Sequence, residues 1–88
     1  MKDKRIFLPP FGFKEGDIVR VSGEGIWTFE ETPRCIGKVE NELGKIRLIL
    51  FNEGETYYVV YLLKREVNVL VTEKFMELAG EDEVNGLL

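Results

Sequence analysis

The chain has 88 residues, of which 44% are hydrophobic and 32% charged, and its formal net charge is −4. This length allows one globular domain. An acidic chain is also a poor default binder of nucleic acid, because phosphate neutralisation supplies most of that affinity. The sequence has no histidine and a single cysteine, Cys35, which excludes a histidine-activated nucleophile, an internal disulfide and a structural zinc site. We therefore expect a protein that is not an enzyme and that holds no metal and no cofactor.

The N-terminal segment is predicted to be an apolar arm, residues 1–13. Its charged start is followed by Ile6–Phe13, which contains Pro9, Pro10 and Gly12. This stretch is too short and too interrupted for a signal peptide or a membrane span. A single unpaired thiol also suits a reducing compartment, so we expect a cytoplasmic protein without a membrane partner. Glutamate outnumbers aspartate 13 to 3 and glutamine is absent, a usage that hints at a thermophilic source.

Glycines at short intervals separate runs rich in β-branched residues, which is typical of a small all-β domain. The first predicted strand is Asp17–Val21, and a long loop, Ser22–Pro33, follows it. The second predicted strand is Cys35–Glu40, with Cys35 as a small core residue. A turn at Asn41–Gly44 then reverses the chain.

The third and fourth predicted strands, Lys45–Phe51 and Glu55–Lys64, form a hairpin. Between them lies Asn52-Glu53-Gly54, which suits a three-residue loop with glycine in the left-handed region. The fifth predicted strand is Val67–Val71. The residues after it are predicted to form a helical turn and a last short strand.

The end of the domain admits a second interpretation, a single helix over Thr72–Ala79 capped by Thr72 and ended by Gly80. A helix of that length is marginal without packing, so we favour the helical turn followed by a strand. Beyond it, residues 80–88 are predicted to be an acidic flexible tail.

This order of elements resembles the SH3-like barrel. Four stretches carry the resemblance: Gly16–Val21, Gly37–Val39, Ile46–Gly54 and Val71–Leu78. The pattern is similar to KOW and Tudor-like domains, to the small electron-transfer accessory proteins of photosystem I, and to the barrel domain of the nitrile hydratase β chain. It implies an all-β, five-stranded barrel over residues 14–79. The alternative, an oligonucleotide/oligosaccharide-binding barrel, usually places a helix where this chain has its tight hairpin turn.

Both faces of the central hairpin are apolar, unlike those of a half-exposed sheet. The more aliphatic face is predicted to join the core, whose expected members are Val19, Val21, Val39, Ile46, Leu48, Leu50, Val60, Leu62, Val69 and Val71. The other face carries a cation and two tyrosines, which is the chemistry of an interface. Its predicted members are Arg47, Ile49, Phe51, Tyr57, Val59, Tyr61 and Leu63.

Three coverings of this second face are open: the chain's own arm around residues 6–11, a partner surface such as a second copy in a weak homodimer, or a small ligand. Trp27 and Phe29 follow the first strand, where SH3-like barrels often line their binding surface, or else they close one end of the barrel. The predicted partner-binding residues are Trp27, Phe29, Arg47, Ile49, Phe51, Tyr57 and Tyr61.

We therefore expect a small accessory module that mediates protein–protein interaction with an unidentified partner. The alternative is a KOW- or Tudor-like nucleic-acid binder, in which basic residues and nearby tyrosines form a single-strand platform. Nearby glutamates weaken that alternative. Its predicted contact residues are Arg34, Lys38, Lys45, Arg47, Lys64 and Arg65.

Overall fold

The computed structural model describes residues 12–80, so most of the predicted arm and tail lie outside the described range. The described chain is all-β, as predicted, with one 3₁₀ turn. Its elements in chain order are β1 (Ile18–Thr28), β2 (Cys35–Asn52), β3 (Glu55–Leu62), β4 (Val67–Val71), the turn η2 (Glu73–Phe75) and β5 (Met76–Leu78). The predicted helical turn and final short strand are confirmed, and the alternative helix is wrong.

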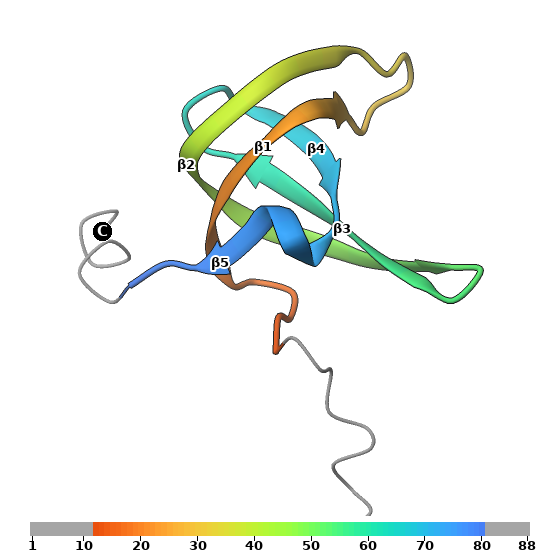
Figure 1. Cartoon of the computed structure of the whole chain (residues 1–88), viewed down its shortest axis with the longest axis vertical. Coiled ribbons are helices and arrows are strands. Elements are labelled where there is room, and N and C mark those ends of the chain that lie inside the picture. The colour runs from red at the N-terminus through yellow and green to blue at the C-terminus, as the bar shows by residue number, and fades with distance from the viewer. Residues whose placement is uncertain (1–11, 81–88) are drawn as a thin grey trace, which may run out of the picture.

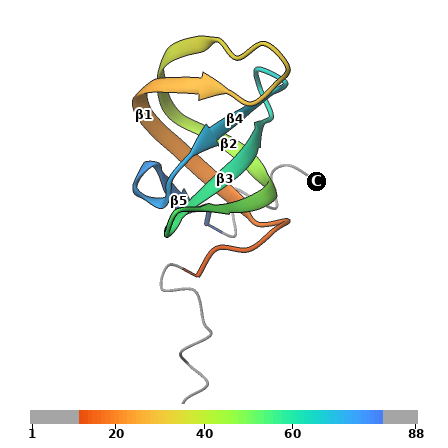
Figure 2. The same ribbon diagram turned by 90° about the vertical axis from the view of Figure 1, so that its right-hand side faces the viewer.

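The five strands form one antiparallel sheet in the order β2-β3-β4-β1-β5, and β2 also pairs with β1. The pairings therefore lead from β2 through β3, β4 and β1 back to β2 (Figures 1 and 2). The sheet thus has an inner side, which faces the core, and an outer side. In Figure 1 the β2–β3 hairpin extends well beyond the other strands.

Strands β1 and β2 are longer than predicted. The first part of the predicted loop Ser22–Pro33, as far as Thr28, is instead the second half of β1, whereas residues 29–33 lie outside the strands as predicted. The turn expected at Asn41–Gly44 lies within β2. Shifts in the β1–β2 register at Gly23 and between Gly23 and Ile26 allow both strands to bend without ending. Glycine therefore marks bends here, and not the loops that its spacing suggested.

The hairpin turn is also tighter than predicted. Asn52 pairs with Glu55, which leaves only Glu53 and Gly54 between the strands. Both have positive φ, 51° and 82°, as a two-residue type I′ turn requires. The predicted three-residue loop is therefore wrong, although Gly54 does take up the left-handed conformation.

Eight of the ten predicted core residues are buried, and Leu48 and Leu50 are not part of the core. The reason is a bulge at Arg47: Ile46 pairs with Val60, but the next paired residue, Leu48, lies opposite Val59. One extra residue reverses the sides of all that follow. The core gains Phe13, Ile26, Tyr58 and Met76, and Ile49 packs against it.

Candidate functional site

A row of apolar side chains crosses the outer side of the sheet. Leu48 of β2 lies opposite Val59 of β3, Val59 opposite Leu70 of β4, and Leu70 opposite Trp27 of β1. Directly opposed residues of antiparallel strands share a side, so four strands contribute one side chain each. We call Leu48, Val59, Leu70 and Trp27 the outer row.

The outer row is partly exposed and partly covered by its own neighbours. Trp27 is 51% exposed and Leu48 44%, whereas Val59 between them is 2% exposed although it lies outside the core cluster. With Phe29, which is 40% exposed, the accessible apolar area is about 300 Å². That is smaller than the roughly 800 Å² per partner of a standard interface, so this surface has the size of an interface centre.

A second, more polar row runs beside the outer row. Lys45 lies opposite Tyr61, and Tyr61 lies opposite Asn68. Phe29 continues this row, because its backbone N–H donates to the carbonyl of Asn68 at 2.8 Å. The bulged Arg47 places its guanidinium carbon 5.9 Å from the centroid of the Tyr61 ring, within the range of a cation–π contact. One side of the apolar surface therefore has a basic and aromatic border.

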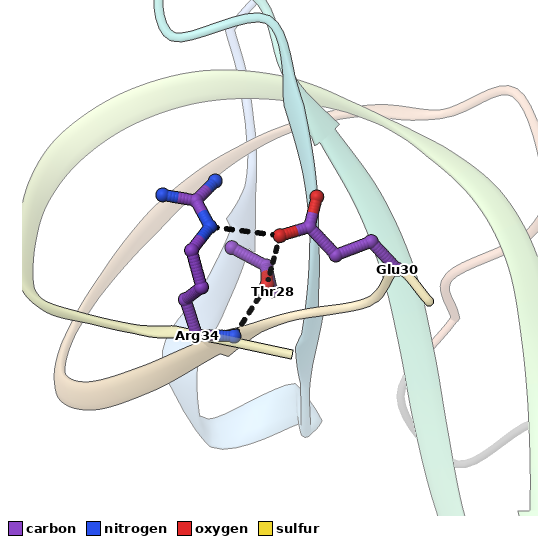
Figure 3. A network of polar contacts seen from close by, with 3 residues as sticks. All are labelled: Thr28, Glu30 and Arg34. Atoms are coloured by element: carbon purple, nitrogen blue, oxygen red, sulfur yellow. Dashed lines mark hydrogen bonds and ion pairs between the residues drawn. The ribbon is translucent and has the colours of Figure 1, made fainter. Parts of the chain in front are cut away.

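The far end of β1 is fixed by a polar network (Figure 3). The buried Thr28 hydroxyl donates to Glu30 Oε2 at 2.9 Å and accepts the backbone N–H of Arg34 at 2.9 Å. Arg34 Nε also donates to Glu30 Oε2 at 2.9 Å. These hydrogen bonds, first from Arg34 and then from Thr28, lower the pKa of the Glu30 carboxyl. The network closes the loop next to Trp27 and Phe29 and so orients both.

A groove of about 740 Å³ lies elsewhere, between the bend of β2 and the turn after β3. Within it Arg65 Nε donates to Glu42 Oε2 at 2.8 Å, and Lys38 Nζ lies 2.9 Å from Glu40 Oε2. The hydrogen bond from Lys38 lowers the pKa of the Glu40 carboxyl. The groove is therefore of mixed charge, and its lining residues are Lys38, Glu40, Asn41, Glu42, Leu43, Leu63, Lys64 and Arg65.

The residues predicted to contact nucleic acid do not form one strip. Lys38, Lys64 and Arg65 line the groove, Lys45 and Arg47 lie beside Tyr61, and Arg34 belongs to the Thr28 network. Lys38 and Arg47 were expected on adjacent strands but lie nine positions apart on β2. Arg34, Lys38 and Arg65 each pair with a glutamate, which reduces the positive field that phosphate binding requires.

Of the predicted partner-binding residues, Trp27, Phe29, Arg47, Tyr57 and Tyr61 lie on the outer side. Ile49 and Phe51 were assigned to the wrong side, because the bulge at Arg47 turns Ile49 toward the core and Phe51 follows it two positions on. Sequence reasoning missed Leu48, which it placed in the core, and Leu70. Nothing in the sequence around Leu48 indicates that a bulge precedes it.

Cys35 is exposed, so its predicted place in the core is wrong. It lies opposite Trp27 and thus shares the outer side with it. Within residues 12–80, no cluster of three or more carboxylate or thiol side chains is placed to hold a metal ion. No helix in that range has the length and apolar character needed to cross a membrane.

The chain was compared with protein-family models, curated proteins and solved structures, and none of them matches it.

Proposed function

We propose that this chain is a non-catalytic, cytoplasmic binding module of the SH3-like barrel class, and that it docks another protein on its outer side. The circuit of strand pairings and the short turn before β5 support the fold assignment. The observation that carries the function is the outer row, in which Trp27 and Leu48 remain accessible around the buried Val59. An aromatic anchor in an apolar centre with a polar border is the usual composition of an interface hot spot.

Complete burial of the exposed apolar area would contribute about 7 kcal/mol before the costs of association. Those costs consume most of this value, so the module is expected to bind weakly unless the border also contributes. Arg47 and Tyr61 offer such a contribution, since the guanidinium already lies over the ring and both groups can donate hydrogen bonds to a partner.

The test compares Leu48→Glu with Leu78→Glu as a matched control, because both leucines are about half exposed, at 44% and 54%. Only Leu48 belongs to the outer row. Each variant and the parent chain are immobilised and exposed to extract from the native source, and bound proteins are quantified by mass spectrometry. We expect one or more partners to be lost with Leu48→Glu and retained with Leu78→Glu. Equal retention by both variants would contradict the proposal.

A second copy is one such partner, and sedimentation identifies it. If the outer row meets itself across a two-fold axis, the parent chain and Leu78→Glu should form a dimer that Leu48→Glu dissociates. A parent chain that sediments as a monomer leaves a different protein as the partner.

Nucleic acid is the second candidate, favoured by Lys45 and Arg47 beside the half-buried Tyr61 on the same side. A single-strand platform combines stacking aromatics with cations in this way. The parent chain should then shift single-stranded DNA or RNA at low salt, lose it steeply as salt rises, and lose it with Arg47→Glu. No shift at low salt would exclude this candidate and leave protein docking in place.

A further inference from the structure

One edge of β2 has no neighbouring strand toward the end of the hairpin. Ile46 still exchanges two backbone hydrogen bonds with the chain before β1: its N–H donates to the carbonyl of Asp17 at 3.0 Å, and its carbonyl accepts the N–H of Gly16 at 2.8 Å. Past Ile46, the edge of β2 that faces away from β3 pairs with no strand of residues 12–80. The hairpin extends beyond the rest of the sheet there (Figure 1), so a further strand could join this edge.

The direction of the backbone groups on this edge follows from Ile46. Because its hydrogen bonds point away from β3, Ile46 and the β3 residue opposite it share none. Such pairs alternate with hydrogen-bonded pairs along β3, which places Tyr58 and Thr56 in the same class, and their partners are Ile49 and Phe51. The N–H and C=O of Ile49 and Phe51 therefore point away from β3, where the described chain supplies no backbone partner for them.

The side chains along this edge are apolar on both sides of the strand. Leu48 and Leu50 lie on the outer side, and Ile49 and Phe51 lie on the inner side. Phe51 is the most exposed large apolar residue of the described chain, at 77%. Edge strands are usually protected from a further strand by a charge, a proline or a bulge, and none of these lies within Leu48–Phe51.

The charges of the hairpin suit a second copy that runs in the opposite direction. Lys45 and Arg47 precede the apolar run, whereas Glu53 and Glu55 follow it, and none of the four takes part in an ion pair within residues 12–80. When two copies of β2 pair antiparallel, the acidic end of each meets the basic start of the other. The free edge of β3 carries Glu55 without a cation, so pairing there would bring like charges together.

We propose that two copies of this chain join edge to edge through residues 47–53, with their β2 strands antiparallel about a two-fold axis at Leu50. In this register Ile49 of each copy lies opposite Phe51 of the other, and such a pair exchanges two hydrogen bonds through the groups that point away from β3. Leu50 lies beside Leu50 of the other copy. Each Arg47 lies opposite Glu53 of the other copy.

The contact is small, because it involves about seven residues a side where a standard interface has 20–30. The dimer should therefore be weak and should depend on protein concentration. Edge pairing leaves Trp27 and Leu70 of the outer row accessible, so it stands independently of the proposed function.

Sedimentation of the full chain over a wide range of concentrations tests the dimer. Phe51→Pro removes an N–H that points away from β3, so it should preserve the hairpin and raise the dissociation constant of the dimer at least about tenfold. Thr56→Pro is the matched control, because Thr56 lies opposite Phe51 and its N–H points to the other edge of the hairpin. This control should dimerise as the parent chain does, and ¹H–¹⁵N spectra verify that both variants fold.

Two results of the sedimentation experiment would overturn the proposal. One is a parent chain that stays monomeric at the highest concentration, and the other is a dimer that Phe51→Pro leaves as strong as that of the parent chain. Trp27→Ser separates this dimer from one through the outer row, since edge pairing should persist in it. A dimer that Trp27→Ser dissociates and Phe51→Pro preserves would be an outer-row dimer and would refute edge pairing.

Disulfide formation tests the register without a proline. In a Cys35→Ser background, Leu50→Cys places two thiols opposite each other in a pair without hydrogen bonds, where the Cα atoms lie about 4.5 Å apart and a disulfide can form. Phe51→Cys is the control, because position 51 is more exposed but lies opposite Ile49 of the other copy. Under mild oxidation we expect a covalent dimer to form several-fold faster with Leu50→Cys. Equal rates, or faster crosslinking with Phe51→Cys, would refute the proposed pairing.

Discussion

The Phe13 ring meets the Tyr58 ring edge-on, with centroids 5.7 Å apart and planes at 77°. This contact attaches the chain before β1 to the inner side of β3, because Tyr58 is one of the largest fully buried residues. Edge-to-face pairs contribute beyond the area they bury. Residues preceding the first strand are thus part of the core.

Phe13→Ala should therefore lower the free energy of unfolding by about 3 kcal/mol, the usual effect of removing a buried phenylalanine. Urea denaturation followed by circular dichroism measures it. Leu78→Ala is the control, since Leu78 is 54% exposed, and its effect should stay within about 0.5 kcal/mol. Equal effects of the two substitutions would show that Phe13 does not stabilise the core.

The alternation of β3 was predictable from the sequence and that of β2 was not. In β3 the residues Val60 and Leu62 face the core as predicted, because no irregularity interrupts their period of two. In β2 the period is broken at Arg47, and an arginine before a run of leucine and isoleucine looks the same in a bulged and a regular strand. The candidate site inherits this error, since Leu48 and Phe51 exchange sides.

The lengths of β1 and β2 could not be predicted from the sequence for a related reason. Glycine ends strands in many sequences, but Gly23 has a different use here. A Cβ at that position would lie 2.3 Å from Cδ1 of Phe75, so glycine allows a ring to approach the backbone within a continuing strand. The requirement for glycine at this position arises from the packing of η2 against β1. Tertiary packing of this kind could not be predicted from the local sequence.

A single substitution in the hairpin turn should raise the free energy of unfolding. Glu53 has φ of 51°, a conformation that costs an ordinary L-residue about 1 kcal/mol and that asparagine tolerates better. Glu53→Asn creates the Asn-Gly pair preferred in type I′ turns and should raise the free energy of unfolding by about 0.5–1 kcal/mol. Glu53→Gln, which removes the same charge without the same backbone preference, is the control. Thermal unfolding of both separates the two causes, and equal gains would assign the effect to charge.

The Thr28 network depends on one buried hydroxyl. Thr28 is 3% exposed, and its oxygen accepts the Arg34 N–H while its proton goes to Glu30. Thr28→Val keeps the shape but leaves that N–H without its acceptor, so we expect a loss of about 1–2 kcal/mol in the free energy of unfolding. Thr28→Ser keeps the hydroxyl and should lose less. If Thr28→Ser destabilises the fold as much as Thr28→Val, the methyl group matters and the hydrogen bonds do not.

Ionisation of the buried Tyr58 phenol should make the fold less stable at alkaline pH. Burial raises the pKa of its phenol from 10.0 to about 12, and the charge of Glu73 adds to the rise. The folded state therefore prefers the neutral phenol, so the stabilisation is complete below the unfolded pKa of 10.0 and is lost as pH rises toward 12. At pH 11 this loss should reach about 1.4 kcal/mol, which corresponds to one pKa unit.

Because the net charge of the chain also changes over this pH range, the measurement is a difference between variants. Urea midpoints are followed from pH 9 to pH 11, at about 0.5 M salt to screen surface charges, for the parent chain, Tyr58→Phe and Tyr57→Phe. The negative charge of Glu55 is the main cause of the raised pKa of Tyr57. Tyr57 is only partly buried, so salt should screen this effect. Tyr58→Phe should therefore flatten the pH dependence, and Tyr57→Phe should follow the parent chain. An unchanged slope in Tyr58→Phe would show that the buried phenol does not govern the alkaline loss of stability.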